Sequence, residues 1–214
     1  MGGLSDLEEY FLSPLEADIL RGQCRVAVDI GANKGQWSHW LSRHFDHVVA
    51  VEPDIRIIDQ LRVTLPENVH LLHAACSDTD GVVDLYMREL PDQTSTLPVH
   101  PIGAGNQADA PVIDKIAVNA VTMDGILSTV RRRFGCDQID FVKLDIEGAE
   151  HIAMAGATPD LFRTTRWLVE IHDNRAAVGE AIRRLGHEDI RLIRHPFPKA
   201  HPEHMWVLFN APAT

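Results

Sequence analysis

Apolar positions along the chain follow two alternating patterns, one typical of buried strands and one typical of amphipathic helices. Short apolar runs predict strands at residues 25–30, 47–51, 69–73, 139–144 and 167–171. Apolar residues spaced three and four apart predict helices at residues 35–45, 54–65, 123–134, 149–155 and 174–185. Because strands alternate with helices, the pattern predicts an α/β fold with helices on both faces of a mostly parallel sheet.

Further strands are predicted in two other parts of the chain. Residues 82–87 and 116–121 show the alternation of strands with one buried face. The last two strand candidates, residues 189–194 and 205–209, are joined without a predicted helix. They are therefore expected to run antiparallel to each other.

Two segments lie outside this pattern of strands and helices. Residues 1–24 are expected to form a helical extension, in which Pro14 breaks or kinks the helix, and residues 25–214 a single domain. Residues 89–111 are rich in Pro, Gly, Gln, Asp and Thr and are too long for a passive connection in a compact domain. They are expected to form either a mobile lid or a contact between the subunits of a homodimer.

The charge and cysteine content of the chain narrow its function and location. The formal net charge is -11, which argues against a nucleic-acid partner because phosphate contacts require clustered lysines and arginines. The cysteines are far apart and form no CxxC pair, so reduced thiols are expected rather than disulfides or a zinc site. No apolar run reaches the roughly 18 residues of a membrane span, and the acidic N-terminus lacks the basic start of a secretory signal. We therefore expect a cytoplasmic protein.

Acidic residues stand at the ends of the predicted strands, where open α/β sheets bind their ligands. Asp29 begins the loop Asp-Ile-Gly-Ala-Asn-Lys-Gly, which has Asn33 in place of the middle glycine of the dinucleotide motif Gly-x-Gly-x-x-Gly. A carboxylate at position 29 would repel a pyrophosphate but suit an ammonium group. Glu52 stands about 20 residues later, at the place where an acid accepts hydrogen bonds from ribose hydroxyls. The ligand indicated is a nucleoside with an amino-acid-like cation and no phosphate, as in S-adenosylmethionine. The alternative is that Asp29 caps a turn and Glu52 is a solvated loop acid.

Several short motifs occur in one order across residues 25–172. They are VDIGANKGQWS, VEPD, HAACSD, VTMD, DFVKLDIEGAE and VEIH. In these motifs the chain resembles the FkbM-type methyltransferases, a branch of the Rossmann-like S-adenosylmethionine-dependent enzymes, and DFVKLDIEGAE is the most specific of them. The resemblance implies a three-layer sandwich with a seven-stranded, mostly parallel sheet whose last strand is antiparallel. It also implies O-methylation, since members of the family are generally assigned to hydroxyls of sugars or polyketides.

The resemblance further implies which residues surround the cofactor S-adenosylmethionine. A loop would lie on its methionine side, an acid would bind its ribose, a strand end would lie against its adenine, and a serine-containing segment would close over it. In chain order these residues are Asp29, Gly31, Asn33 and Gly35 for the loop, Glu52 for the ribose, Ala75 with Ser77 or Asp78 for the adenine, Ser95 or Thr96 for the closing segment, and Asp145.

Methyl transfer to a hydroxyl requires that the acceptor is positioned and loses its proton. Glu170 and His172 are two apart on one strand end and share a face, and Asp145 ends the strand before them. His172 is expected to act as the base, with Asp145 or Glu170 orienting it. As alternatives, Asp145, Glu170 and His172 ligate Mg²⁺ or Mn²⁺, or they only bind and orient the acceptor.

Three further charged residues belong to the same stretch of the chain. Lys143 lies inside an apolar strand and is expected either to be ion-paired or to join the catalytic residues, with a nearby carboxylate as its partner. Glu147 and Glu150 are expected to stabilise the N-terminus of the following helix.

These observations predict an S-adenosylmethionine-dependent methyltransferase that acts on a hydroxyl of a sugar, glycolipid or polyketide-type small molecule. The alternatives are an N-methyltransferase and a non-catalytic protein that binds a ligand or partner on the same fold. An NAD-dependent oxidoreductase fits less well, because the chain lacks Gly-x-Gly-x-x-Gly and has Asp29 before the turn.

Overall fold

The computed structural model describes residues 15–23, 25–98, 110–172, 174–187, 190–194 and 204–209. The expectations for residues 1–14 and for the part of the lid or subunit contact at 99–109 lie outside the described residues. None of the helices in the described part of the chain is long and apolar enough to cross a membrane.

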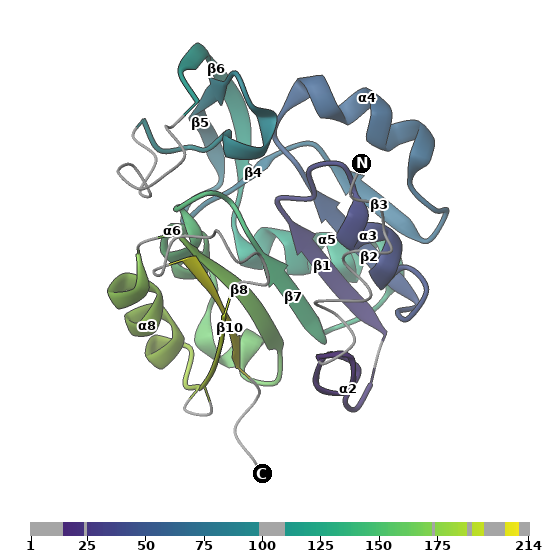
Figure 1. Cartoon of the computed structure of the whole chain (residues 1–214). Helices are drawn as coiled ribbons and strands as arrows, with labels where there is room; N and C mark the ends of the chain where they lie inside the picture. The colour runs from purple at the N-terminus through teal and green to yellow at the C-terminus, as the bar shows by residue number, and fades with distance from the viewer. Residues whose placement is uncertain are drawn as a thin grey trace.

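A seven-stranded sheet forms the centre of the domain, as predicted (Figure 1). Its strands lie in the order β3 (Val69–Leu72), β2 (His47–Val51), β1 (Val26–Ile30), β7 (Phe141–Leu144), β8 (Arg166–His172), β10 (His204–Phe209) and β9 (Ile190–Arg194). The pairs from β3 to β8 are parallel, whereas β10 runs antiparallel to both β8 and β9. The strand order reverses between β1 and β7, and such a switch point is where open α/β sheets bind ligands.

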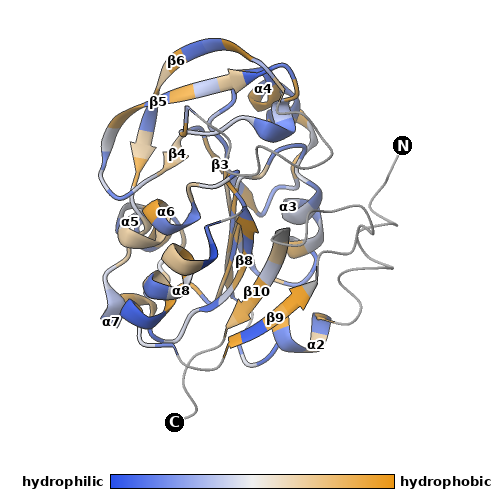
Figure 2. Ribbon diagram, turned by 60° about the vertical axis from the view of Figure 1, so that its left-hand side comes forward, coloured by the Kyte–Doolittle hydropathy of each residue, from blue (hydrophilic) through white to orange (hydrophobic). Residues whose placement is uncertain are grey.

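Helices cover both faces of the sheet, which confirms the predicted three layers. One face carries α5 (Met123–Phe134), α6 (Glu150–Ala155), α7 (Pro159–Phe162) and α8 (Arg175–Arg184), and the other carries α2 (Glu16–Ile19), α3 (Gln36–Leu41) and α4 (Ile55–Thr64). Figure 2 shows the first group to the left of the strands and α2 and α3 to their right. Val28 and Val142 pack on the first face and Ala27 and Phe141 on the second, so the central strands are buried on both sides.

Two of the longer helices begin at side-chain caps. The carboxylate of Asp54 accepts a hydrogen bond from the N–H of Arg56 at the start of α4. The hydroxyl of Thr122 accepts one from the N–H of Gly125 at the start of α5. Each cap satisfies a donor that the helix itself leaves without a partner, which explains why both helices begin close to the predicted positions.

A second sheet of three strands lies beyond the carboxyl ends of the central strands, at the top of Figure 1. It contains β4 (Ala75–Cys76), β6 (Val112–Val121) and β5 (Gly81–Arg88), with β6 in the middle. β6 begins before the strand predicted at 116–121. The prediction missed the first residues of β6 because they are exposed and lack the alternation of a half-buried strand. The sequence does not predict a separate sheet, since the pairing of β4, β5 and β6 is set by tertiary contacts.

Candidate active site

A cleft opens at the switch point, between the ends of β1, β2 and β7 and the small sheet. The space between its walls measures about 590 Å³, part of which is open to solvent. The loop after β1 contributes Gly31 and Asn33, and the end of β2 contributes Glu52. The loop after β7 contributes Asp145 and Glu147, so segments far apart in the sequence line one cavity.

Gly31 allows the ends of β1 and β7 to approach each other closely. Its φ is +76°, and a Cβ there would lie 1.8 Å from the main-chain oxygen of Asp145. Asn33 also has a positive φ, 47°, which asparagine tolerates better than most residues. Gly35, with φ +80°, precedes α3 and is not among the residues that line the cleft. Of the predicted loop, Gly31 and Asn33 are therefore the residues that face the ligand space.

Glu52 is the buried acid at one side of the cleft. Its Oε1 accepts a hydrogen bond from the N–H of Asp54 and its Oε2 accepts one from the N–H of Asn33, both at 2.8 Å. Burial raises the pKa of Glu52 to about 7, although these two N–H groups oppose the shift. The Oδ1 of Asn33 is buried and has no hydrogen-bond partner among the described residues. A carboxylate and an orphaned amide oxygen beside one cleft suit a ligand that carries hydroxyl groups.

Asp29 is not among the residues that line the cleft, and the contact of its carboxylate with an ammonium group of the ligand stays a prediction. Its side chain is fully buried, because alternate residues of β1 point to opposite faces and Asp29 points towards α3. The hydroxyl of Ser38 donates to its Oδ2 at 2.6 Å, and the Nζ of Lys143 lies 3.3 Å from its Oδ1. The cation beside Asp29 is therefore a lysine of the protein itself.

Lys143 is ion-paired beneath the cleft. It pairs in register with Asp29 across β1 and β7, and its Nζ also lies 3.4 Å from Asp145 Oδ2 and donates to the main-chain oxygen of Gly31 at 2.8 Å. Burial alone lowers the pKa of Lys143, but the carboxylates of Asp145, Asp29 and Glu170 outweigh burial and raise it. Lys143 therefore stays charged and forms an ion pair with Asp145. The ammonium group of Lys143 is not part of the cleft lining.

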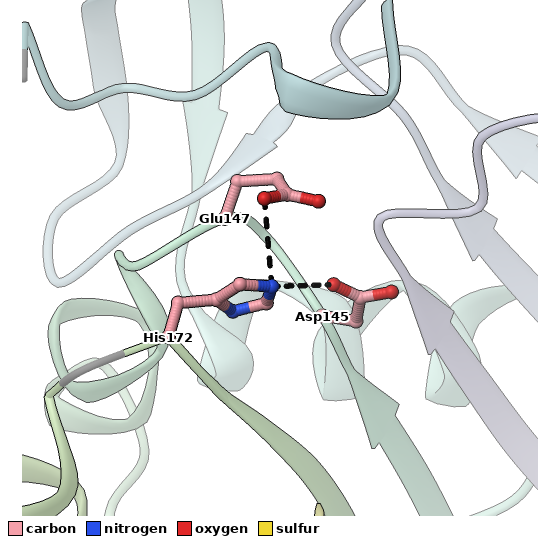
Figure 3. A group of neighbouring side chains, drawn as sticks. All are labelled: Asp145, Glu147 and His172. Atoms are coloured by element: carbon pink, nitrogen blue, oxygen red, sulfur yellow. Dashed lines mark ion pairs between the residues drawn. The ribbon is translucent and has the colours of Figure 1, made fainter. Parts of the chain in front are cut away.

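Asp145, Glu147 and His172 meet beside the cleft (Figure 3). The Nε2 of His172 lies 3.4 Å from an oxygen of Glu147 and 3.8 Å from an oxygen of Asp145. Figure 3 shows the edge of the imidazole directed towards both carboxylates. His172 is buried, whereas both acids are partly exposed and line the cleft. Glu147 has a φ of 57°, so a left-handed backbone conformation brings its side chain to this place.

Burial and neighbouring charges shift the pKa values of Asp145 and His172. Burial and the neighbouring Glu170 raise the pKa of Asp145 well above its ordinary value. Burial alone lowers the pKa of His172, but Glu147 and Glu150 outweigh burial and raise it well above its ordinary value. Both shifts reflect an excess of carboxylates, which favours the retention of a proton or another cation in this part of the protein.

Glu150, at the start of α6, holds the imidazole of His172. Its Oε1 lies 3.0 Å from the Nδ1 of His172 and also accepts hydrogen bonds from two N–H groups of the preceding loop. Its Oε2 accepts a hydrogen bond from the Nδ2 of Asn174 at 2.7 Å. Glu150 thus holds the Nδ1 side of the imidazole, and the orientation of His172 by Asp145 or Glu170 stays a prediction.

Glu170 lies outside the group of ligand atoms that the structure brings together, in contrast to the predicted set of Asp145, Glu170 and His172. It shares a face of β8 with His172, but it precedes His172 by two residues, which is about 6.6 Å along a strand. The carboxylate of Glu170 still acts on this region, because it raises the pKa of Lys143 and of His172. Glu147 takes its place in the cluster.

The small sheet and the segment between β5 and β6 form the other wall of the cleft. Ala75 and Cys76 line this wall, whereas Ser77 and Asp78 lie beyond the lining and are joined by a hydrogen bond at 3.3 Å. The predicted contact of Ser77 or Asp78 with an adenine stays a prediction.

The segment that follows β5 spans the cleft. It contains the single turn η2 (Pro91–Gln93), where Asp92 accepts a hydrogen bond from the Nδ2 of Asn33 at 3.1 Å. Ser95 lines the cleft, and its hydroxyl donates to the main-chain oxygen of Glu147 at 3.0 Å. The segment therefore connects the loop after β1 with the loop after β7, over the space between them.

Comparison with known families decides which protein family has this site. Residues 29–195 match the methyltransferase FkbM domain. The chain belongs to the FkbM methyltransferase family. No curated protein matches the chain significantly.

Solved structures share the fold of this FkbM domain. The FkbM methyltransferase of Methylobacillus flagellatus matches with a TM-score of 0.58 and 17% identity over 97% of this chain and 48% of that protein, so this chain spans about half of its length. An rRNA methylase of Streptococcus thermophilus matches with a TM-score of 0.51 and 12% identity, over 92% of this chain and 94% of that one. The Streptococcus mutans protein SMU.1697c, in complex with SAH, has a TM-score of 0.50 and 12% identity, over 92% of this chain and 96% of that one. At these identities the likeness shows a Rossmann-like methyltransferase fold.

Sequence reasoning missed the places of Glu147 and Glu150 in this FkbM site. Both were expected to serve the helix after β7, because acids are common at helix N-termini. A signal was present in the motif DIEGAE, where Glu147 stands directly before Gly148. Gly148 has a φ of 102°, and a strand-end acid next to such a turn is carried back towards the cleft.

Proposed function

We propose that this FkbM-family protein is an S-adenosylmethionine-dependent methyltransferase that methylates a hydroxyl of a sugar, glycolipid or polyketide-type small molecule. The observation that supports this most is one cleft lined by Glu52 and also by Asp145 and Glu147, with His172 behind the two acids. Glu52 suits the diol of a ribose, and the acids with His172 suit an acceptor beside it. The family and the fold support the same class of reaction.

The residues around the cleft fit this cofactor. Gly31 keeps the turn after β1 free of a side chain, and Glu52 offers two oxygens to the ribose hydroxyls. The buried Oδ1 of Asn33 can accept a hydrogen bond from the cofactor. Ala75 and Cys76 provide an apolar wall for an adenine. The presence of SAH in the Streptococcus mutans structure, which has the same fold, supports this class of ligand.

The reaction needs an acceptor oxygen beside the Asp145, Glu147 and His172 cluster. Bound in the cleft, the cofactor would supply a methyl group to the acceptor's oxygen, its sulfur would keep the electron pair of the broken carbon–sulfur bond, and the acceptor's proton would leave to water. The protein contributes mainly by holding the acceptor in line, beside groups that accept a hydrogen bond from its hydroxyl. Lys143 fixes Asp145 from below, and Glu170 adds negative charge behind it.

The charge around the cleft favours an acceptor without phosphate or carboxylate groups. Asp92, Asp145 and Glu147 all line it, and an anionic acceptor would be repelled by them. The net charge of -11 adds to this effect and disfavours nucleic acid. A neutral polyol is the acceptor that this environment supports best.

Thermal unfolding with S-adenosylhomocysteine tests the cofactor site. At 100 times its dissociation constant the ligand should add about 2.7 kcal/mol, which is roughly 5–10 °C of melting temperature for a domain of this size. Glu52→Ala should lose this shift, and Glu67→Ala, which removes an exposed acid of the same kind, should keep it. NAD should give no shift.

Methyl transfer is then measured by mass spectrometry with S-adenosylmethionine and a panel of sugars, glycolipids and polyketide alcohols. Transfer to amine analogues alone would indicate an N-methyltransferase. Ligand binding without transfer to any member of the panel would favour the non-catalytic alternative. No shift with S-adenosylhomocysteine in the native chain would rule out the proposed function.

A further inference from the structure

The Asp145, Glu147 and His172 cluster has the spacing of a cation site (Figure 3). One ligand atom from each residue lies within 4.8 Å of the others. The distances from His172 Nε2, 3.4 Å to Glu147 and 3.8 Å to Asp145, exceed the roughly 2.7–3.2 Å of an N–H···O hydrogen bond. Two ligands bound at about 2.1 Å to one octahedral cation are about 3.0 Å apart when adjacent and about 4.2 Å apart when opposite. The observed distances fall between these values, as expected of groups that share an ion.

The orientation of His172 independently indicates a metal ligand. Its Nδ1 lies 3.0 Å from Glu150, and Asn174 holds the other oxygen of that carboxylate at 2.7 Å. If a cation replaces the proton on Nε2, Nδ1 still donates its hydrogen to Glu150, and the lone pair of Nε2 is directed between Asp145 and Glu147. Metal-binding histidines are usually held in this way, by a carboxylate on the second ring nitrogen.

The balance of charge in this region also favours a cation. Three carboxylates, those of Asp145, Glu147 and Glu150, lie within 3.8 Å of the imidazole nitrogens of His172. Lys143 pairs with Oδ2 of Asp145 and leaves Oδ1 directed towards His172. When His172 is neutral, the negative charge of these carboxylates is greater than the positive charge of Lys143 beside them. Buried charge without compensation is energetically costly. A divalent cation would offset the excess.

We propose that Asp145, Glu147 and His172 bind one divalent cation, Mg²⁺ or Mn²⁺, which holds the hydroxyl of the acceptor during methyl transfer. Two carboxylate oxygens and one imidazole nitrogen suit a hard cation that tolerates nitrogen. A hydroxyl bound to the cation is more acidic, so its proton leaves to water without His172 acting as the base.

The number of ligands also indicates the kind of acceptor. Three protein ligands leave positions of an octahedral cation open for water and for oxygens of the acceptor. An acceptor with two adjacent hydroxyls, as in a sugar diol, would occupy two of these positions and present one oxygen to the methyl group. This inference rests on the proposed function, and it narrows the acceptor from any hydroxyl to a chelating diol.

Binding of Mn²⁺ alone tests the site, measured by electron paramagnetic resonance on the full chain after treatment with a chelator. The native chain should bind one Mn²⁺, and pulsed spectra should show coupling to an imidazole nitrogen. Glu147→Gln should weaken binding at least tenfold, and His172→Gln should remove the nitrogen coupling. Glu150→Gln, which disturbs the support of His172 and of the loop before α6, should weaken binding by about tenfold.

Glu170→Gln provides a control, because it removes a buried acid that shares a face of β8 with His172 but lies outside the ligand group. It should still bind one Mn²⁺ with nitrogen coupling, and more tightly than Glu147→Gln. Absence of Mn²⁺ binding to the native chain, with or without S-adenosylhomocysteine, would overturn the proposal. Equal binding to native, Glu147→Gln and His172→Gln chains would overturn it as well.

The two proposals fail in different ways. If S-adenosylhomocysteine binds and methyl transfer persists in the presence of a chelator, the cation is wrong, the proposed function stands, and His172 is left as the base. If Mn²⁺ binds as expected but S-adenosylhomocysteine does not, the cation site stands and the proposed function is wrong.

Discussion

A single carboxylate, that of Glu52, shows how burial changes the chemistry of one side chain. It accepts hydrogen bonds from two N–H groups, yet burial still raises its pKa from 4.5 to about 7. Because the folded chain holds this proton more tightly than the unfolded chain, the contribution of Glu52 to stability decreases as the pH rises from 4.5 to about 7. The same acid should therefore control ligand binding near neutral pH.

Affinity for S-adenosylhomocysteine should increase with pH if the ionised form of Glu52 accepts the ribose hydroxyls. With a pKa of about 7, roughly one tenth of the carboxyl is ionised at pH 6 and roughly nine tenths at pH 8, so the affinity should rise about tenfold. Isothermal titration calorimetry at pH 6, 7 and 8 measures this. Glu52→Gln should bind weakly and without the pH dependence. An equal affinity of the native chain at all three pH values would contradict the assigned role.

At the scale of elements, the segment after β5 joins two loops that belong to different strands. Asp92 contacts Asn33 in the loop after β1, and Ser95 donates to the main-chain oxygen of Glu147 in the loop after β7. Ser95 also pairs with Tyr86 through the main chain, which ties the segment to β5. The segment is therefore placed to retain a ligand that lies in the cleft below it.

Ser95→Ala should speed the release of S-adenosylhomocysteine. The variant loses the hydrogen bond to the main-chain oxygen of Glu147, and a bond of this kind is worth about 1 kcal/mol, or about fivefold in rate. Stopped-flow displacement of the ligand measures the rate. Ser128→Ala removes a hydroxyl that bonds only within α5, and it should leave the rate as in the native chain. Equal rates in both variants would show that the segment does not retain the ligand.

At the scale of the whole molecule, the described part of the N-terminal extension is packed into the domain. Ile19 of α2 is fully buried in the cluster that also contains Phe141 and Trp206 of the central sheet. The guanidinium of Arg166 on β8 donates to the main-chain oxygen of Gln23 at 2.9 Å. The boundary at residue 24, a prediction from the sequence, therefore separates segments that share one core.

Ile19→Ala should destabilise the entire domain in a single unfolding transition. Removal of a buried isoleucine side chain typically costs about 2–5 kcal/mol, because the cavity closes only in part. Urea unfolding followed by circular dichroism measures the loss. Val63→Ala changes an exposed side chain of α4 and should stay within about 0.5 kcal/mol of the native chain. A loss of that small size for Ile19→Ala would mean that α2 unfolds separately.

Most of the framework was predictable because its signals are local. The apolar runs of β1, β2, β7 and β8 and the caps of α4 and α5 depend on neighbours within a few residues. Their alternation determined the parallel sheet, and the motifs between them led to the FkbM family, which the comparison confirmed. Glu52 and Gly31 were also found in this way, since both stand at strand ends, where ligands bind in such sheets.

Only the tertiary structure decided the contacts between charged groups. Asp29 meets Lys143 because the register of β1 with β7 places them side by side, and Glu147 replaces Glu170 beside His172 because a left-handed turn brings it back. Glu150 reaches His172 because α6 packs against the end of β8. The sequence by itself thus determined the elements, their order and the edge of the sheet that carries the site. Which acid faces which cation depends on strand register and on side-chain directions across segments far apart in the chain, and no local pattern encodes these.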